Sequence, residues 1–253
     1  MPVLSVEEHI ASIYESLFRA WGRQHWWPAR SRFEVIVGAY LTQNTNWTNV
    51  ELALRQLRAA RMLNVGGIRN ISRRKLERLI RSSGYFRQKA QRLKTFVGFL
   101  DQDYGGSLTR MFARPTAELR EQLLALNGVG PETADSILLY AGQHPVFVVD
   151  AYTRRIAARH GLLREDTKYD DIRTMFEKAL VAQESLASTG TSSGSLGGAS
   201  HRPSRMSLTA RAPLAQIFNE MHGLIVGVGK KYCLKSSPRC EECPLKLLLP
   251  AGN

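Results

Sequence analysis

The sequence predicts a mainly α-helical protein. Apolar residues recur three and four positions apart through most of the chain, whereas strand-like alternation is too scarce for a substantial sheet. The 253 residues are enough for one large domain or for two small helical lobes that share a cleft. The hydrophobic fraction of 43% is ordinary for a soluble globular protein, so a sizeable core is expected.

The helical pattern can be followed along the chain. Residues 6–21 form an amphipathic stretch, and after Pro28 the side chain of Ser31 is placed to cap a helix through residues 33–40. Further helical stretches are expected after Asn44, after Ser72, along positions Lys89, Leu93, Phe96 and Leu100, and over residues 214–226. Residues 101–106 are interpreted as a polar, glycine-rich turn between helices.

A Ser/Gly-rich segment over residues 184–213 interrupts this pattern. It has too few apolar positions to offset the entropy of ordering, so a flexible insertion is expected. Its arginines leave a contact with DNA open, although a passive linker is the favoured interpretation of this composition.

The charge of the chain points to a polyanionic partner. Lys and Arg total 35 against 22 Asp and Glu, a net charge of +13. Cationic side chains displace counterions from phosphates, so nucleic acid is favoured over a merely basic surface. No apolar run is long enough to cross a bilayer, and the acidic first turn at the N-terminus is unlike a secretory signal, so no membrane partner is expected.

A helical hairpin over residues 118–141 is the clearest local motif. Two helical stretches meet at Asn127-Gly128-Val129-Gly130, and Pro131 suits the first position of the second helix. Gly128 and Gly130 permit positive φ and close approach of a phosphate, which the turn amides and the helix end would bind, while Val129 would pack inward. An ordinary αα-hairpin with a glycine cap is the alternative.

The segment from Leu123 to Gly161 resembles the helix-hairpin-helix, Gly/Pro-rich loop and aspartate of the endonuclease III and adenine glycosylase superfamily of base-excision enzymes. Further matches lie in residues 41–45, residues 84–90 and the C-terminal cysteines, so the resemblance covers nearly everything except the insertion. It implies two helical lobes around a DNA-binding cleft. One lobe comprises residues 1–30 and 145–253, and the other comprises residues 31–144.

The resemblance implies that Asp150 is the catalytic carboxylate of a DNA N-glycosylase. Asp150 follows four apolar residues, 146–149, and precedes a predicted helix, where an aspartate is also a common N-cap. The two roles are compatible, because one oxygen can cap the helix while the other faces a cleft. Cleavage of the N-glycosidic bond places positive charge on the sugar, and a fixed carboxylate stabilises that charge and orients water.

Glu132 occupies the position at which bifunctional members of this family carry a lysine, two residues after Gly130. A carboxylate cannot form a Schiff base, which requires an amine. We therefore predict a monofunctional glycosylase with weak or absent lyase activity. Glu132 itself is expected to act as a first-turn acid that complements the helix dipole.

Base excision requires the damaged nucleotide to leave the helix. By resemblance, Gln43 would enter the vacated space and Tyr85 would wedge into the opposite strand, whereas a polar turn residue and a core aromatic are the plain alternatives. Asn46 and Trp47, with Trp26 and Trp27, are candidates for a base pocket. An aromatic sandwich suits a cationic base, and the resemblance is greatest to the 3-methyladenine glycosylase branch, with oxidised pyrimidines as the competing substrate.

The three cysteines, Cys233, Cys240 and Cys243, resemble the start of a C-terminal [4Fe-4S] loop. The family pattern calls for a fourth cysteine at Leu249, which cannot ligate iron. A three-thiolate cluster with an outside ligand, another metal such as zinc with His222, and no metal all stay open. An odd, clustered set does not suit disulfides, so a reducing cytoplasmic setting, at the nucleoid in a bacterium, is expected.

The expected partner is double-stranded DNA with a damaged base, bound by a monomer. Two alternatives remain: a non-catalytic helix-hairpin-helix module, and a glycosylase with lyase activity that recruits a lysine elsewhere. A binding module alone does not require Asp150, Gln43 and Tyr85 together.

Overall fold

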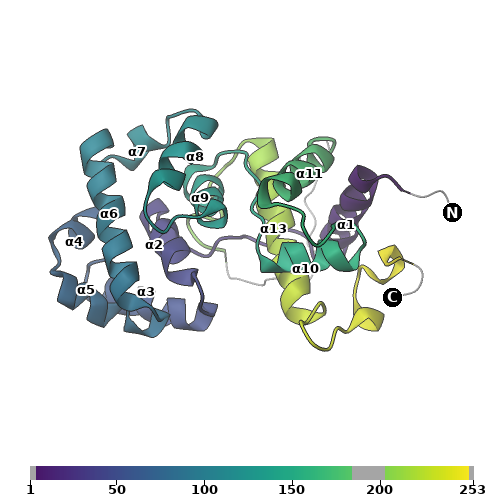
Figure 1. The fold of residues 1–253 in the computed structure, drawn as a ribbon, viewed down its shortest axis with the longest axis horizontal. Coiled ribbons are helices and arrows are strands. Elements are labelled where there is room, and N and C mark those ends of the chain that lie inside the picture. Colours follow the sequence, from purple (N-terminus) through teal and green to yellow (C-terminus); the bar gives the residue numbers. More distant parts are fainter. Residues whose placement is uncertain (1–3, 184–202, 251–253) are drawn as a thin grey trace. The chain divides into compact units, whose positions relative to one another are not determined.

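The computed structural model describes residues 4–183 and 203–250, and these fold into two units (Figure 1). Unit 1 combines residues 1–28 with 143–253, and unit 2 is the continuous stretch 29–142. Within the described ranges all regular structure is helical, which confirms the predicted all-α class. None of the helices in those ranges is both long and apolar enough to span a membrane.

Unit 2 is a bundle of short helices around α6. Its core includes four side chains that are each at most 1% exposed, those of Tyr40, Phe96, Leu119 and Leu123. Serine and asparagine side chains begin several of its helices, as Ser31 does for α2 and Ser72 for α5. The elements are α2 (Arg32–Thr42), α3 (Trp47–Ala59), α4 (Val65–Asn70), α5 (Arg73–Leu79), η1 (Arg81–Ser83), α6 (Phe86–Tyr104), α7 (Leu108–Met111), α8 (Thr116–Ala125), α9 (Pro131–Ser136) and the π-helical turn η2 (Ile137–Gly142).

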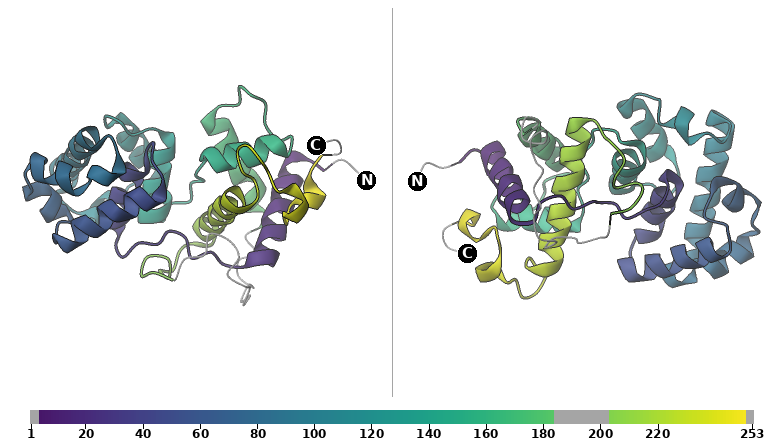
Figure 2. Two further views of the ribbon diagram at one scale, coloured as in Figure 1. Left: turned by 90° about the horizontal axis from the view of Figure 1, so that it is seen from below. Right: turned by 180° about the vertical axis from the view of Figure 1, so that it is seen from behind.

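Unit 1 is built around α13, with α1, α10 and α11 packed against it (Figure 1). The apolar face of α1 buries Ile10, Ile13 and Leu17, and the short turn η4 near the C-terminus lies beside α1 (Figure 2). The elements are α1 (Val6–Trp21), α10 (Ala151–Arg159), α11 (Tyr169–Val181), α13 (Pro213–Lys231), η3 (Cys240–Glu242) and η4 (Lys246–Leu248).

Two expectations from the sequence need correction. The expected turn at 101–106 is the last turn of α6 up to Tyr104, and the left-handed Gly105 (φ 55°) ends the helix. Of the expected flexible insertion, residues 184–202 lie outside the described residues. The described part packs into unit 1: Met206 and Ser207 are buried, and Ser204 Oγ donates to the Trp27 carbonyl at 3.3 Å.

Candidate functional site

Asp150 sits at the N-terminus of α10, at the end of a buried extended segment. Residues 146–149 are each at most 2% exposed. Two amides of that segment donate to α11 side chains, Phe147 N to Glu177 Oε1 at 2.9 Å and Val149 N to the Tyr169 hydroxyl at 3.2 Å. The backbone that leads to Asp150 is therefore anchored to α11 at two points, which helps to fix the position of the carboxylate.

The two oxygens of Asp150 have different partners. Oδ1 accepts hydrogen bonds from Thr153 N at 2.8 Å and Thr153 Oγ1 at 3.0 Å, which is the geometry of a helix N-cap. Oδ2 lies 3.5 Å from His222 Nε2 of α13. The side chain of Asp150 is 14% exposed and that of His222 is 5% exposed. One oxygen thus holds the helix, and the other belongs to a small polar site.

The pKa of Asp150 is lowered from its ordinary value. Burial by itself raises this pKa, but the charge and hydrogen bond of His222 and the two hydrogen bonds from Thr153 together outweigh burial. The carboxylate is therefore ionised at neutral pH although little of it is exposed. An ionised carboxylate in a nearly dry setting has a strong electrostatic effect on any positive charge that develops beside it.

The surroundings of the Asp150–His222 pair are mostly aromatic. The Trp26 and Phe147 rings lie 6.2 Å and 6.4 Å from the His222 ring, centroid to centroid. The Lys230 ammonium lies 5.9 Å from the centre of the Trp26 ring, and its charge interacts with Asp150. A side chain at Gly223 would have its Cβ 3.1 Å from that of Trp26, so this glycine permits the Trp26 segment to pack on α13.

The position of His222 corrects one expectation. A zinc site that combines His222 with the cysteines would need His222 beside the C-terminal loop, but its Nε2 faces Asp150. The spacing along α13 explains the difference, because His222 lies about two and a half turns before the end of that helix at Lys231. The sequence contained no signal that linked His222 to Asp150, since the two are 72 positions apart.

The hairpin in unit 2 consists of α8, the turn 127–130, and α9 with Pro131 at its start. Val129 is buried, as expected for a residue that fastens the two helices. Gly128 has φ 78° and its Cα faces the Arg92 side chain, so a side chain there would clash. Gly130 is different: its φ is −93° and nothing lies within 4 Å of a Cβ built on it, so the conformation does not require glycine.

Gln43 contacts the hairpin. Its Nε2 donates to the Gly128 carbonyl at 2.9 Å and to Thr133 Oγ1 at 3.0 Å, and its Oε1 accepts from Arg92 at 2.6 Å. In the protein without DNA, the candidate for filling the vacated base position is thus held by α6 and by the hairpin. Arg92 was not singled out from the sequence, because an arginine on a helix has no distinguishing pattern.

Tyr85 projects from the loop before α6. It is 64% exposed and has left-handed backbone geometry, with φ 44° and ψ 31°. The alternative that Tyr85 is a core aromatic is therefore wrong. Asn46 caps α3 through its Oδ1, which accepts from Asn49 N at 3.0 Å, and Trp47 at the start of that helix is half-buried. Glu132 is exposed in the first turn of α9.

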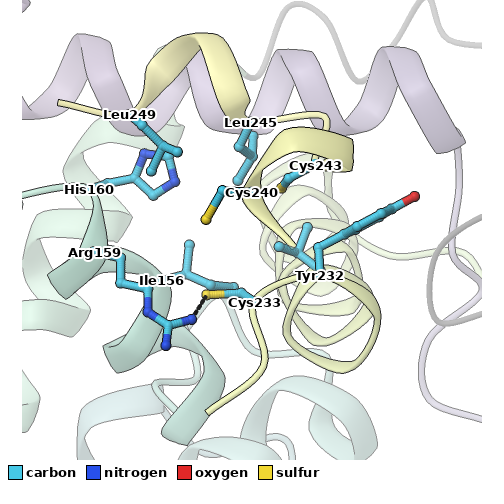
Figure 3. A pocket seen from close by; sticks show the side chains of 10 residues that line it. Ile156, Arg159, His160, Tyr232, Cys233, Cys240, Cys243, Leu245 and Leu249 are labelled. Carbon is cyan, nitrogen blue, oxygen red and sulfur yellow. Dashed lines mark hydrogen bonds between the residues drawn. The ribbon is translucent and has the colours of Figure 1, made fainter. Parts of the chain in front are cut away.

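The three cysteines line one pocket in unit 1, together with Leu249 and with His160, the residue that follows α10 (Figure 3). The Arg159 guanidinium donates to Cys233 Sγ at 3.1 Å and to the carbonyls of Leu234 and Lys235. Among the residues the structure describes, no group of three or more His, Cys, Asp and Glu side chains is arranged to hold a metal ion. Leu249, at the fourth position of the cysteine pattern, lines the same pocket and offers no ligand to iron, so the loop does not fit a four-thiolate cluster.

One buried polar side chain, that of Asn219, was not identified from the sequence. Asn219 of α13 is 1% exposed, and within the described residues neither its Oδ1 nor its Nδ2 has a hydrogen-bond partner. It precedes His222 by three positions, which places both on neighbouring parts of one helix face. A lone asparagine in an apolar helix carries no pattern that predicts its surroundings.

Comparison with protein families gives a match over residues 37–181 to the HhH-GPD superfamily of base excision DNA repair proteins. The matched range includes the Gln43 and Tyr85 segments, the hairpin and Asp150. It leaves out α1, α13 and the cysteine loop.

Individual relatives extend this match to nearly the whole chain. A protein of Methanocaldococcus jannaschii, named as a candidate DNA repair glycosylase, is 41% identical over 94% of both chains. Endonuclease III of Thermotoga maritima is 25% identical over 85% of this chain and 80% of its own. Among solved structures, the 3-methyladenine DNA glycosylase of H. pylori, bound to 1,N6-ethenoadenine, has a TM-score of 0.71 and 30% identity over 90% of this chain and 98% of its own. An endonuclease III–DNA covalent intermediate shares the fold, with a TM-score of 0.69 and 21% identity.

Proposed function

The chain belongs to the endonuclease III-like HhH-GPD superfamily of base excision DNA repair glycosylases, and from that premise we propose that it is a monofunctional N-glycosylase that uses Asp150. The observation that carries this proposal is the state of the carboxylate. It is nearly buried and held by Thr153, and its pKa is lowered although burial opposes ionisation.

In the proposed reaction, the bond from C1′ to the base breaks and the sugar becomes oxocarbenium-like. The fixed charge of Asp150 stabilises that cation without any reorganisation of the carboxylate. His222 beside Oδ2 keeps the oxygen oriented and limits the places that a water can occupy. That water attacks C1′, Asp150 accepts its proton, and the base leaves with the electron pair of the broken bond.

We propose that the duplex is held and opened by unit 2. The turn Gly128-Val129-Gly130 would bind a backbone phosphate at the hairpin through the amides of its two glycines, since the Val129 amide donates to the Leu126 carbonyl at 3.1 Å. Gln43 and Tyr85 would enter the duplex when the damaged nucleotide leaves it. The partner we propose is double-stranded DNA with a damaged base, bound by a monomer in the cytoplasm, at the nucleoid in a bacterium. The charge of +13 supports such a partner.

The substrate class we propose is an alkylated purine. The solved H. pylori relative is a 3-methyladenine glycosylase with an etheno-adenine bound, and it is similar over nearly its entire length. Trp26 beside the Asp150–His222 pair offers an aromatic face, and Trp47 is a second candidate. Electron-rich rings favour a base that carries positive charge. Oxidised pyrimidines are the competing class, given the endonuclease III relatives.

Absence of strand cleavage is the second part of the proposal, and Glu132 supports it because it has no amine. One observation favours the bifunctional alternative. Lys230 lies over Trp26, and burial lowers its pKa although Asp150 opposes that shift, so a larger share of its amine is neutral than for a solvated lysine. If the chain has lyase activity, Lys230 is therefore the amine to test.

The test uses duplexes with a single 3-methyladenine, etheno-adenine or thymine glycol, and measures free base and strand breaks separately. We expect base release without breaks. Asp150→Asn should abolish release, because it keeps an oxygen for the Thr153 cap but loses the charge. Asp171→Asn removes an equal charge from the exposed start of α11 and should leave release unchanged.

Three outcomes would contradict the proposal. Binding of lesion duplexes without any base release favours the non-catalytic module. Base release by Asp150→Asn at the wild-type rate would show that Asp150 is not the catalytic carboxylate. A covalent DNA adduct trapped by borohydride in wild type but not in Lys230→Met establishes the bifunctional alternative.

A further inference from the structure

Lys89 is a buried lysine at the start of α6, and it bonds to two separate chain segments. Its side chain is 1% exposed. Nζ donates to the carbonyl of Leu41 at 2.8 Å and to the carbonyl of Ser83 at 2.6 Å. Leu41 belongs to the end of α2, whereas Ser83 ends η1, so a single ammonium joins segments that are more than 40 positions apart.

Each of those carbonyls lies just before an unusual backbone turn. Leu41 is followed by Gln43 and by Asn44 with φ 53°, and Ser83 is followed by Gly84 with φ 67° and Tyr85 with φ 44°. A left-handed backbone is uncommon for any residue other than glycine, and most of all for a bulky one such as tyrosine. Such geometry persists only where surrounding contacts impose it. Lys89 supplies one such contact to each turn.

Other contacts also hold the two turns, and Asn49 of α3 bonds to both segments, because its Nδ2 donates to Thr45 Oγ1 at 3.1 Å and its carbonyl accepts from the Tyr85 loop. Ser82 Oγ ties the Tyr85 loop to α3, through the Asn49 carbonyl at 2.9 Å. Arg92, one turn after Lys89, bonds the side chain of Gln43. Lys89 differs from Arg92 and Asn49 in that a single atom, Nζ, binds a backbone carbonyl of each segment.

Stability does not account for a lysine at this place. A buried ammonium has a large desolvation cost, and an apolar side chain of similar length commonly serves the core at least as well. A lysine there is explained by the two hydrogen bonds that it makes. Because they fix the carbonyls of Leu41 and Ser83 to one atom, they fix the separation of the turns that follow.

We propose that Lys89 is a positioning residue that sets the spacing between Gln43 and Tyr85, so that the two side chains enter the duplex together. This inference rests on the proposed function, since it assigns both side chains to duplex opening. Lys89 touches neither DNA nor the reacting atoms in this role. It acts through the two turns.

The test compares Lys89→Met with Lys94→Met. Lys94 is on the same helix and also donates to two carbonyls, those of Arg69 and Ile71, but neither belongs to the Gln43 or Tyr85 turn. Base extrusion is followed by the fluorescence of 2-aminopurine placed beside the lesion, and affinity is measured on the same duplex. We expect Lys89→Met to slow extrusion and base release about tenfold or more with affinity nearly unchanged, and Lys94→Met to match wild type.

A double-mutant cycle with Tyr85→Ala separates positioning from general damage. If Lys89 acts through the turn, Lys89→Met should add little to the extrusion defect of Tyr85→Ala. Additive defects, or normal extrusion by Lys89→Met, would overturn the proposal. If Lys89→Met does not fold, Lys89→Gln, which keeps one donor, takes its place in the same cycle.

Amide hydrogen exchange of the free protein distinguishes this inference from the proposed function. Lys89→Met should accelerate exchange at residues 41–45 and 83–86 relative to Lys94→Met, whether or not any lesion is excised. Unchanged exchange rates at these residues would contradict the positioning role of Lys89 and leave the proposed function unaffected. Faster exchange with no base release from any duplex counts against the proposed function alone.

Discussion

Two glycines of one hairpin turn should respond in opposite ways to the same substitution. Gly128 has φ 78°, and a Cβ built on it lies 1.9 Å from Arg92 Nε and 2.6 Å from Arg92 Cδ. Gly130 has φ −93° with no heavy atom within 4 Å of its Cβ position. Gly128→Ala is therefore the perturbation, and Gly130→Ala is its matched control.

The expected cost at Gly128 has two parts. Left-handed geometry costs alanine about 1 to 2 kcal/mol. The clash also displaces the Arg92 guanidinium, which then loses its hydrogen bond to Gln43, and for a partly exposed charged donor that loss is about 1 kcal/mol. The free energy of unfolding should fall by about 2 to 3 kcal/mol. Gly130→Ala should be neutral or stabilise by about 0.5 kcal/mol, because it restricts the unfolded chain.

Urea unfolding followed by circular dichroism measures both variants, and thermal unfolding should show a decrease of about 5 to 10 °C for Gly128→Ala alone. Duplex affinity adds a second measurement. Gly130→Ala should weaken DNA binding without loss of stability if a phosphate approaches the turn closely. Equal destabilisation of the two variants, or a larger loss for Gly130→Ala, would refute the conformational reasoning.

Three further predictions follow from buried groups and from the cysteine loop. Burial lowers the pKa of Lys89 to about 8, below its ordinary value of 10.5 in the unfolded chain. Between pH 8 and pH 10.5, Lys89 is therefore protonated to a greater extent in the unfolded state than in the folded state. The free energy of unfolding consequently rises with pH over this range. The gain is at most about 3 kcal/mol, and a comparison of denaturation at pH 7 and 9.5 should show it in wild type and not in Lys89→Met. Asn219→Leu should raise the free energy of unfolding by about 1 to 2 kcal/mol, since it removes an amide without described partners, and a loss of stability in urea would show that the amide is satisfied. Wild-type protein reconstituted with iron and sulfide should bind less than a full cluster, and Leu249→Cys should bind more, by iron analysis and visible absorption. Four irons on the wild type would contradict our assessment of the loop.

Much of the fold could be predicted because its signals are local. Ser31 and Ser72 cap helices where the sequence indicates, and Pro131 occupies the first turn of α9. Asp150 also caps α10, as its residue type favours at that place. The helix end at Tyr104 was misjudged, because Asp and Gln after Leu100 suggest a turn, whereas Gly105 is the residue that ends the helix.

The environment of the site could be predicted far less well. His222 reaches Asp150, and Arg92 reaches Gln43, only because helices distant in sequence pack together. The positions of Gly128 and Gly130 seemed equivalent in the sequence, yet only the first has positive φ. Lys89 was placed in the periodic pattern of its helix, but that pattern predicted neither its burial nor its two carbonyl partners.

The discontinuous make-up of unit 1 has a consequence for synthesis on the ribosome. Helix α1 leaves the exit tunnel early, but its packing partners α11 and α13 follow only after all of unit 2 has been made. At about 5 to 20 residues per second, the nascent α1 exposes its apolar stripe for on the order of ten seconds. The helices of unit 2 are not separated from their packing partners in this way, because unit 2 is one continuous stretch of sequence. A chaperone that binds short apolar helices would therefore find α1 without its packing partners during that time.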